Sequence, residues 1–142
     1  MAELNLVKCR KIVRAAFEKG RELNLKPLSV VVLDSGGNVL AFERQDGASV
    51  GRFQIADGKA NAAVMMGVPS SALMERAEQQ AYFVGALSGV YSGRFIPVPG
   101  GALVKDNKGL VKGAVGVTGD TSENDALCAI AGIEAAAFTA EA

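Results

Sequence analysis

The sequence predicts a layered α/β domain built around an antiparallel sheet. Two strand-turn-strand units, an amphipathic helix before the first unit and an almost entirely apolar helix after the second indicate this fold. Each unit is joined by a short turn, which connects only antiparallel neighbours. The chain has 142 residues, the usual size of one domain, so we expect a single unit over residues 1–142.

The N-terminal part predicts a helix followed by a hairpin. Apolar residues recur at helical spacing over residues 4–23, with Lys, Arg and Glu between them. Pro27 rules out a longer helix, and residues 28–33 are typical of a buried strand. The turn over residues 34–38 tolerates positive φ, so residues 39–44 are expected to return as an antiparallel strand.

A second helix is expected over residues 50–66, and its helical wheel has two apolar strips on opposite sides. A helix of this kind should lie between its own sheet and a further element. The two strips consist of Ile55, Ala62 and Met66, and of Phe53, Ala60 and Val64. A third helix follows Pro69, and residues 79–94 are expected to be helical at first and irregular through Ser88 and Gly89.

The C-terminal part predicts a second hairpin and a final helix. Strands are expected over residues 102–105 and 110–118, and the small face of Ala114, Gly116 and Thr118 would let a helix or ligand come close. Ser122 and Asp125 form a capping-box pattern before a helix over residues 124–138. Capping also explains the acidic residues here better than a metal would, so no metal site is predicted.

Composition excludes several classes of function. The chain has no His, 17 Gly and a formal net charge of zero. Without a basic cluster nucleic acid is not an expected partner, and no apolar run reaches the length of a membrane span. No secretory signal is evident, which favours a cytoplasmic location. Cys9 and Cys128 lie in helical patterns among apolar neighbours and are expected to be buried rather than paired.

Several motifs occur in order along almost the whole chain. They are Val31-Val32-Leu33-Asp34-Ser35-Gly36-Gly37-Asn38-Val39-Leu40-Ala41-Phe42, Asp46-Gly47-Ala48, Lys59-Ala60, Pro99-Gly100-Gly101 and Gly113-Ala114-Val115-Gly116-Val117-Thr118-Gly119. In these motifs the chain resembles the haem-binding or haem-degrading domain family. That family includes GlcG-like proteins, streptomycete haem-binding proteins and the C-terminal domain of PduO-type adenosyltransferases.

The resemblance implies a profilin-like α/β/α fold with a central antiparallel sheet, a homo-oligomer and a pocket near the subunit interface. It makes haem a candidate cofactor, but the cofactor stays unknown because no histidine is present to ligate iron. A Thr that the family often has beyond Lys-Ala is replaced by Ala62 or Ala63. The remaining residue types able to ligate haem iron are expected to pack in the core or an interface. They are Tyr82, Tyr91, Met65, Met66 and Cys128.

The bend at Pro99, Gly100 and Gly101 is the first candidate ligand site. Two glycine amides without Cβ atoms could converge on a carboxylate or propionate, as in backbone nests. The alternative is a turn that only leads into the next strand. Sequence reasoning leaves the two interpretations open.

Arg52 and Lys59 are the second candidate. They lie seven residues apart, on one edge of the same helix, and could hold a carboxylate together. Alternatively, they are solvated charges at an interface, or one of them pairs with Asp57 or Glu43.

Three functional hypotheses follow. The first is an oligomeric small-molecule-binding protein, a catabolic accessory protein whose ligand is carboxylated or tetrapyrrole-like and contacts Arg52, Lys59 and the Pro99–Gly101 bend. The second is an enzyme of hydroxy-acid or aromatic catabolism, in which backbone amides stabilise an oxyanion and Lys59 or Asp57 moves the proton. The third is a structural or chaperone-like oligomer. The sequence leaves open whether the chain is an enzyme.

Overall fold

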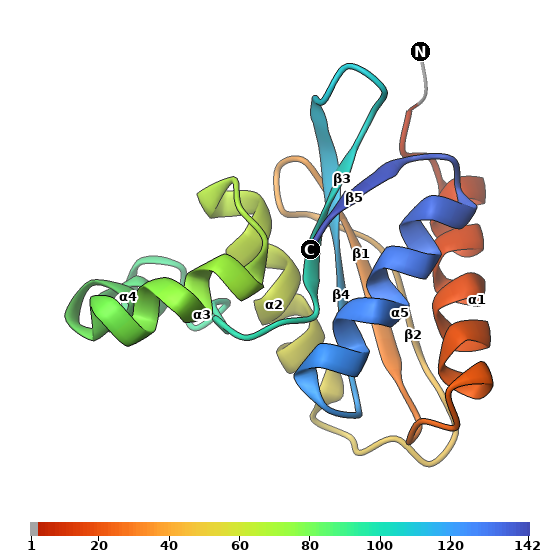
Figure 1. Ribbon diagram of the computed structural model, residues 1–142, viewed down its shortest axis with the longest axis horizontal. Coiled ribbons are helices and arrows are strands. Elements are labelled where there is room, and N and C mark those ends of the chain that lie inside the picture. The colour runs from red at the N-terminus through yellow and green to blue at the C-terminus, as the bar shows by residue number, and fades with distance from the viewer. Residues whose placement is uncertain (1–2) are drawn as a thin grey trace.

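The computed structural model describes residues 3–142 and contains five helices and five strands in that range (Figure 1). In chain order they are α1 (Leu6–Glu22), β1 (Ser29–Asp34), β2 (Val39–Arg44), α2 (Arg52–Met66), α3 (Ser70–Gln79), α4 (Ala81–Val90), β3 (Gly101–Lys105), β4 (Val111–Thr118), α5 (Ser122–Ala135) and β5 (Thr139–Glu141). None of the helices over this range is long and apolar enough to cross a bilayer.

The five strands form one sheet in the order β2-β1-β4-β3-β5, and each neighbouring pair is antiparallel. Both predicted hairpins are present, β1 with β2 and β3 with β4. The pairing of β1 with β4 joins the hairpins and places Val31 opposite Gly116. The central strands therefore come from both halves of the chain.

Helices cover both faces of the sheet, which confirms the α/β/α layers (Figure 1). On one face α1 and α5 pack over Val30, Val32, Val115 and Val117. On the other face α2 packs over Val31, Leu33 and Ala114. The two sets of strand residues alternate along the chain, as expected for strands buried on both faces.

Both apolar strips of α2 pack against neighbouring elements as predicted, through every member except Ile55. Ala60, with Phe53 and Val64 at its margin, faces the sheet. Ala62 and Met66 face a small separate core formed with α3, α4 and Phe95. Helices α3 and α4 extend away from the sheet as an arm, and α2 lies between this arm and the sheet (Figure 1).

The structure corrects three boundaries. Helix α4 continues through Ser88 and Gly89 to Val90 instead of becoming irregular. Helix α5 ends at Ala135, and residues 139–141 form the edge strand β5 beside β3. The N-cap of α5 is Thr121, whose side chain accepts a hydrogen bond from the Asn124 amide, so Ser122 is the first residue of the helix.

Glycines let α2 approach the sheet closely. A Cβ atom added to Gly116 would overlap the carbonyl oxygen of Ala56, and one added to Gly101 would overlap the carbonyl oxygen of Lys59. Both overlaps involve backbone atoms of α2, which cannot rotate away as a side chain can. The small face of β4 therefore receives a helix.

We expect Gly116→Ala to lower the free energy of unfolding by about 1–3 kcal/mol, because the added methyl group forces α2 away from β4. Urea unfolding followed by circular dichroism measures the change. Gly85→Ala on α4 is the matched control, since an added Cβ there meets nothing within 4 Å. The control should be neutral or stabilising by up to about 1 kcal/mol. Equal losses in both variants would contradict the close packing of α2.

Candidate functional site

Lys59 projects into the protein interior. Its side chain is 3% exposed, and its Nζ lies 3.0 Å from Asp125 Oδ2 and 3.0 Å from the carbonyl oxygen of Val117. Asp125, on α5, is 1% exposed and also accepts a hydrogen bond from the Asp120 amide. The contact joins helices from opposite faces of the sheet through the end of β4.

Burial and pairing act in opposite directions on these two groups. Burial lowers the pKa of the Lys59 ammonium, and attraction to Asp125 opposes that shift. Burial likewise raises the pKa of the Asp125 carboxyl, and Lys59 opposes it. Each group thus supplies the charge that makes burial of the other tolerable.

The bend at residues 99–101 is closed by contacts within the protein. Pro99, Gly100 and Gly101 are all buried. The Gly101 amide donates to Ser70 Oγ at 2.8 Å, and the Gly100 carbonyl accepts from the Val117 amide at 2.9 Å. A Cβ on Gly100 would lie 2.9 Å from Lys59 Nζ. These glycines make room for the Lys59 side chain, which corrects the expectation of an open receptor for an anion.

Arg52 lies near Lys59 but at the surface. Its Nη1 donates to Thr118 Oγ1 at 3.0 Å and its Nε to Ser49 Oγ at 2.8 Å. With Lys26, Gly47 and Gly119 it lines a hollow of about 210 Å³. Because Lys59 points inward and Arg52 outward, the two cations do not form the joint carboxylate clamp that the sequence suggested.

Asp57 is held by a residue that sequence reasoning did not consider. Arg94 donates to both carboxylate oxygens of Asp57, at 2.7 and 2.9 Å, and to the Gly37 carbonyl at 2.8 Å. These groups line a hollow of about 430 Å³ that also contains Phe53. Lys59 has its contacts elsewhere, with Asp125 and Val117. Lys59 and Asp57 therefore do not share one site, and proton transfer by Lys59 or by Asp57 stays a prediction from the sequence.

The acidic residues at the start of α5 make their contacts within the protein. Asp120 accepts hydrogen bonds from the Asn124 side chain and the amides of Thr121 and Lys26, which lower its pKa to about 2. Asp125 is committed to Lys59. Over residues 3–142 no group of three or more His, Cys, Asp or Glu side chains could hold a metal ion together.

A stripe of arginines on α1 forms a different candidate site. Arg10, Arg14, Phe17 and Arg21 follow one another at spacings of four, three and four residues, which keeps them within about 60° on the helix wheel. The stripe is about 16 Å long. The buried face of α1 faces the sheet and α5, so the stripe lies on the flank of the helix, beside β2.

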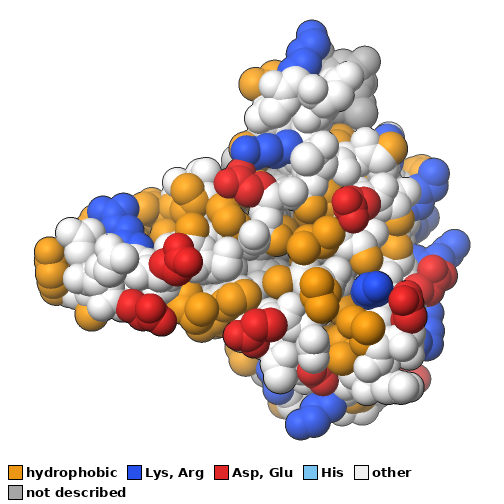
Figure 2. Space-filling model, viewed as in Figure 1, with side chains coloured by type: hydrophobic (Ala, Val, Ile, Leu, Met, Phe, Trp, Pro, Cys, Tyr) orange, Lys and Arg blue, Asp and Glu red, His pale blue; other side chains and the backbone are white. Residues whose placement is uncertain are grey.

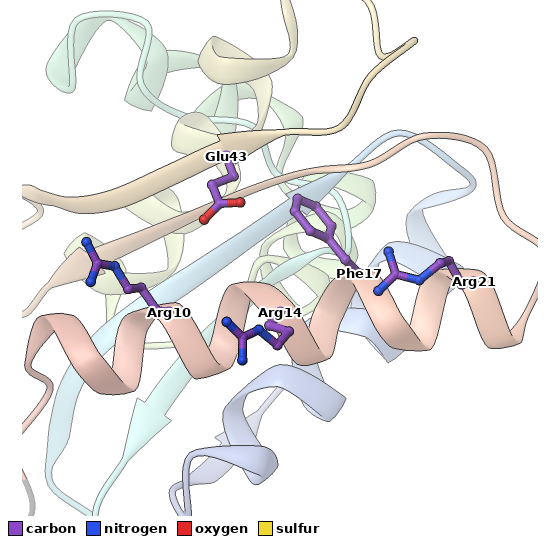
Figure 3. Close-up of a pocket in the computed structure, with 5 residues that line it drawn as sticks. All are labelled: Arg10, Arg14, Phe17, Arg21 and Glu43. Carbon is purple, nitrogen blue, oxygen red and sulfur yellow. The ribbon is translucent and has the colours of Figure 1, made fainter.

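The space between this stripe and β2 is a groove, shown in Figure 3. We call it the arginine groove; it is lined by Arg10, Arg14, Phe17, Arg21 and Glu43 and has a volume of about 420 Å³. Glu43 extends from β2 toward α1, and the Phe17 ring points back toward it (Figure 3). A second hollow of about 530 Å³ shares Phe17, Arg21 and Glu43 and continues the groove past Pro27.

The charged groups of the groove have no partners within the described part of the chain. No hydrogen bond or ion pair in residues 3–142 involves the side chains of Arg10, Arg14 or Arg21, and Glu43 makes no ion pair there. Arg52, Lys59 and Arg94, by contrast, all donate to protein acceptors. The arginine groove is therefore a place where three neighbouring cations remain available to a ligand.

Sequence reasoning missed this groove, although part of its signal was present. Helix α1 carries six of the fifteen Lys and Arg residues, and three arginines share one stripe with an aromatic residue. The stripe alone looks like an ordinary solvated helix face. Only the position of β2 beside it turns the stripe into the wall of a groove.

Comparisons with known proteins show which family this chain belongs to. A family model described as "Haem degrading protein HbpS-like" matches residues 4–134. A 15.0 kDa protein encoded between dhaT and dhaS in Citrobacter freundii is 32% identical over 129 residues, which are 91% of this chain and 89% of the relative. The chain therefore belongs to the HbpS-like family.

Solved structures show the same fold. The structure of HbpS is 30% identical with a TM-score of 0.81, covering 94% of this chain and 90% of HbpS. Protein ORFY of Klebsiella pneumoniae is 28% identical with a TM-score of 0.85, and the match covers 96% of this chain and 93% of ORFY. A PduOC structure in complex with haem is 24% identical with a TM-score of 0.87, and the match covers 99% of this chain and 100% of PduOC. At this level of identity it supports the fold alone.

We expect Lys59→Met to lower the free energy of unfolding by about 3–5 kcal/mol, because it leaves the Asp125 carboxylate buried without its partner. The double variant Lys59→Met, Asp125→Asn should recover part of this loss, since the amide carries no charge. Urea unfolding of both proteins at neutral pH measures the difference. A Lys59→Met protein as stable as the wild type would show that the pair is not a structural contact.

Proposed function

We propose that this protein binds a planar, carboxylated small molecule, such as a tetrapyrrole, in the arginine groove. One observation carries the proposal: three guanidinium groups without protein partners stand in a row beside the half-buried ring of Phe17. A guanidinium binds a carboxylate with two parallel hydrogen bonds, and an aromatic ring offers a flat apolar contact.

Charge distinguishes the arginine groove from the hollows beside Arg94 and Arg52. Three arginines and one glutamate line it, which favours an anion. In the hollow beside Arg94, Asp57 neutralises the guanidinium through two hydrogen bonds. In the hollow beside Arg52, Thr118 and Ser49 already accept from the guanidinium. A free carboxylate gains most where the cations are unpaired.

Size and family membership also support a ligand of this class. A volume of about 420 Å³, extended by the neighbouring hollow of about 530 Å³, is in the range of ordinary ligand pockets. The family model is described as haem-degrading. A tetrapyrrole has both the flat ring system and the carboxylates that this groove suits.

We also infer a homo-oligomer. The apolar surface of α2 and α5 gives little support for it, because most of that surface is covered within the chain, by the arm and by α1. The arm gives better support: Tyr82 is 77% exposed and Val90 is 64% exposed. Figure 2 shows hydrophobic side chains gathered along this projecting part. The cytoplasmic location and the catabolic accessory role remain predictions from the sequence.

We expect the triple variant Arg10→Gln, Arg14→Gln, Arg21→Gln to bind haemin about 10- to 100-fold more weakly than the wild type. Exposed ion pairs contribute up to about 1 kcal/mol each, and about 1.4 kcal/mol corresponds to a factor of ten. Titration followed by the Soret band measures the affinity.

The control carries the same charge change outside the groove, as Lys19→Gln, Arg76→Gln, Lys108→Gln. It should bind haemin as the wild type does. Equal weakening of haemin binding in both triple variants would show that net charge, and not the arginine groove, causes the loss of affinity. No binding by the wild-type protein would exclude a tetrapyrrole ligand.

We expect Tyr82→Ser, Val90→Ser to shift the protein toward the monomer, because the substitutions remove exposed apolar area from the arm. Sedimentation velocity at micromolar concentration compares it with the wild type. A wild-type protein that is already monomeric there would contradict the oligomer.

A further inference from the structure

We infer that the arginine groove recognises its ligand by carboxylates and ring surface alone, without a bond from the protein to a metal ion at the ligand's centre. The inference rests on the proposed function and defines its ligand class more closely: metal-free and metal-containing planar dicarboxylates should bind alike. It departs from haem ligation, the property that the family resemblance suggests.

The groove lacks the side chains that ordinarily ligate haem iron. Histidine is absent from the whole sequence. The lining residues of the groove and of its continuation are Arg10, Arg14, Phe17, Arg21, Leu25, Pro27, Glu43, Arg44, Gln45 and Asp46. None of them carries an imidazole, thiol, thioether or phenol.

The cysteines nearest to the groove do not reach it. Cys9 and Cys128 are both 0% exposed, in the core beneath α1 and α5. Burial raises the pKa of the Cys128 thiol to about 11, so it stays protonated at neutral pH. A protonated, enclosed thiol is a poor ligand for iron outside the core.

The methionines and tyrosines of the described chain lie on the other side of the sheet. Met65 and Met66 belong to α2, and the Tyr91 hydroxyl contacts Met66 Sδ at 3.7 Å. Tyr82 lies on α4, in the arm, and Met74 on α3. Since α1 and β2 form the groove and α1 covers the opposite face from α2, these side chains do not contact a ligand bound in the groove of the same chain.

Two lining carboxylates remain: Glu43, which lines the groove itself, and Asp46, which lines only its continuation. Val30, the partner of Glu43 across the β1–β2 pair, belongs to the core under α1, so Glu43 projects from the same face of the sheet. Its carboxylate is exposed and carries the same charge as the carboxylates of the proposed ligand. We assign Glu43 a repulsive role that keeps ligand carboxylates on the arginines, and no role as an iron ligand.

The test compares haemin with iron-free protoporphyrin IX on the full-length protein. Protoporphyrin fluorescence gives its affinity directly, and displacement by haemin gives the second affinity. We expect the two to agree within about threefold, because no protein ligand adds a metal bond. We also expect Glu43→Gln to bind haemin as well as or better than the wild type, with Glu18→Gln, also on α1, as the control.

Haemin binding tenfold or more tighter than protoporphyrin, together with weakened haemin binding in Glu43→Gln, would overturn the inference and leave the proposed tetrapyrrole function standing. Binding of neither porphyrin would overturn the proposed function, and the inference with it. Binding of both with similar affinity, abolished in the triple arginine variant, supports both statements.

Discussion

The contact of Lys59 with Asp125 and the Val117 carbonyl is the interaction on which the arrangement of the layers depends. It connects α2 on one face of the sheet to α5 on the other, through the last residues of β4. An ammonium group buried this deeply is tolerable only when its hydrogen bonds and its charge are satisfied. The positions of α2 and of the α5 terminus are therefore coupled.

This constraint explains the glycines around the contact. Gly100 leaves space for the end of the Lys59 side chain, and Gly101 and Gly116 let the α2 backbone lie against the sheet. The Gly-rich motifs that resembled a ligand site thus serve packing in this chain. The family pattern at Lys59 and at the double glycine belongs to one structural unit, because the lysine occupies the space that the glycines leave.

The same constraint separates structural charges from charges available for binding. Lys59, Asp57, Arg94 and Asp125 are paired with one another or with backbone groups. The arginines of α1 lie on the flank of a helix whose other side fills the core, and they have no such partners. Membership in the HbpS-like family fixes the fold, but it does not transfer a mode of iron ligation to a chain without histidine.

The sequence by itself determined the elements whose signals are local. The turn at residues 34–38 set the first hairpin, and the two apolar strips of α2 required a layer on each side of that helix. The tertiary structure decided what depends on distant residues. Strand β5 has three residues and forms only because β3 offers an edge for it to pair with. Burial of Lys59 depends on the charge of Asp125, a residue 66 positions further along the chain. The groove likewise needs β2 beside α1, since a row of exposed arginines becomes a binding surface only when a second wall faces it.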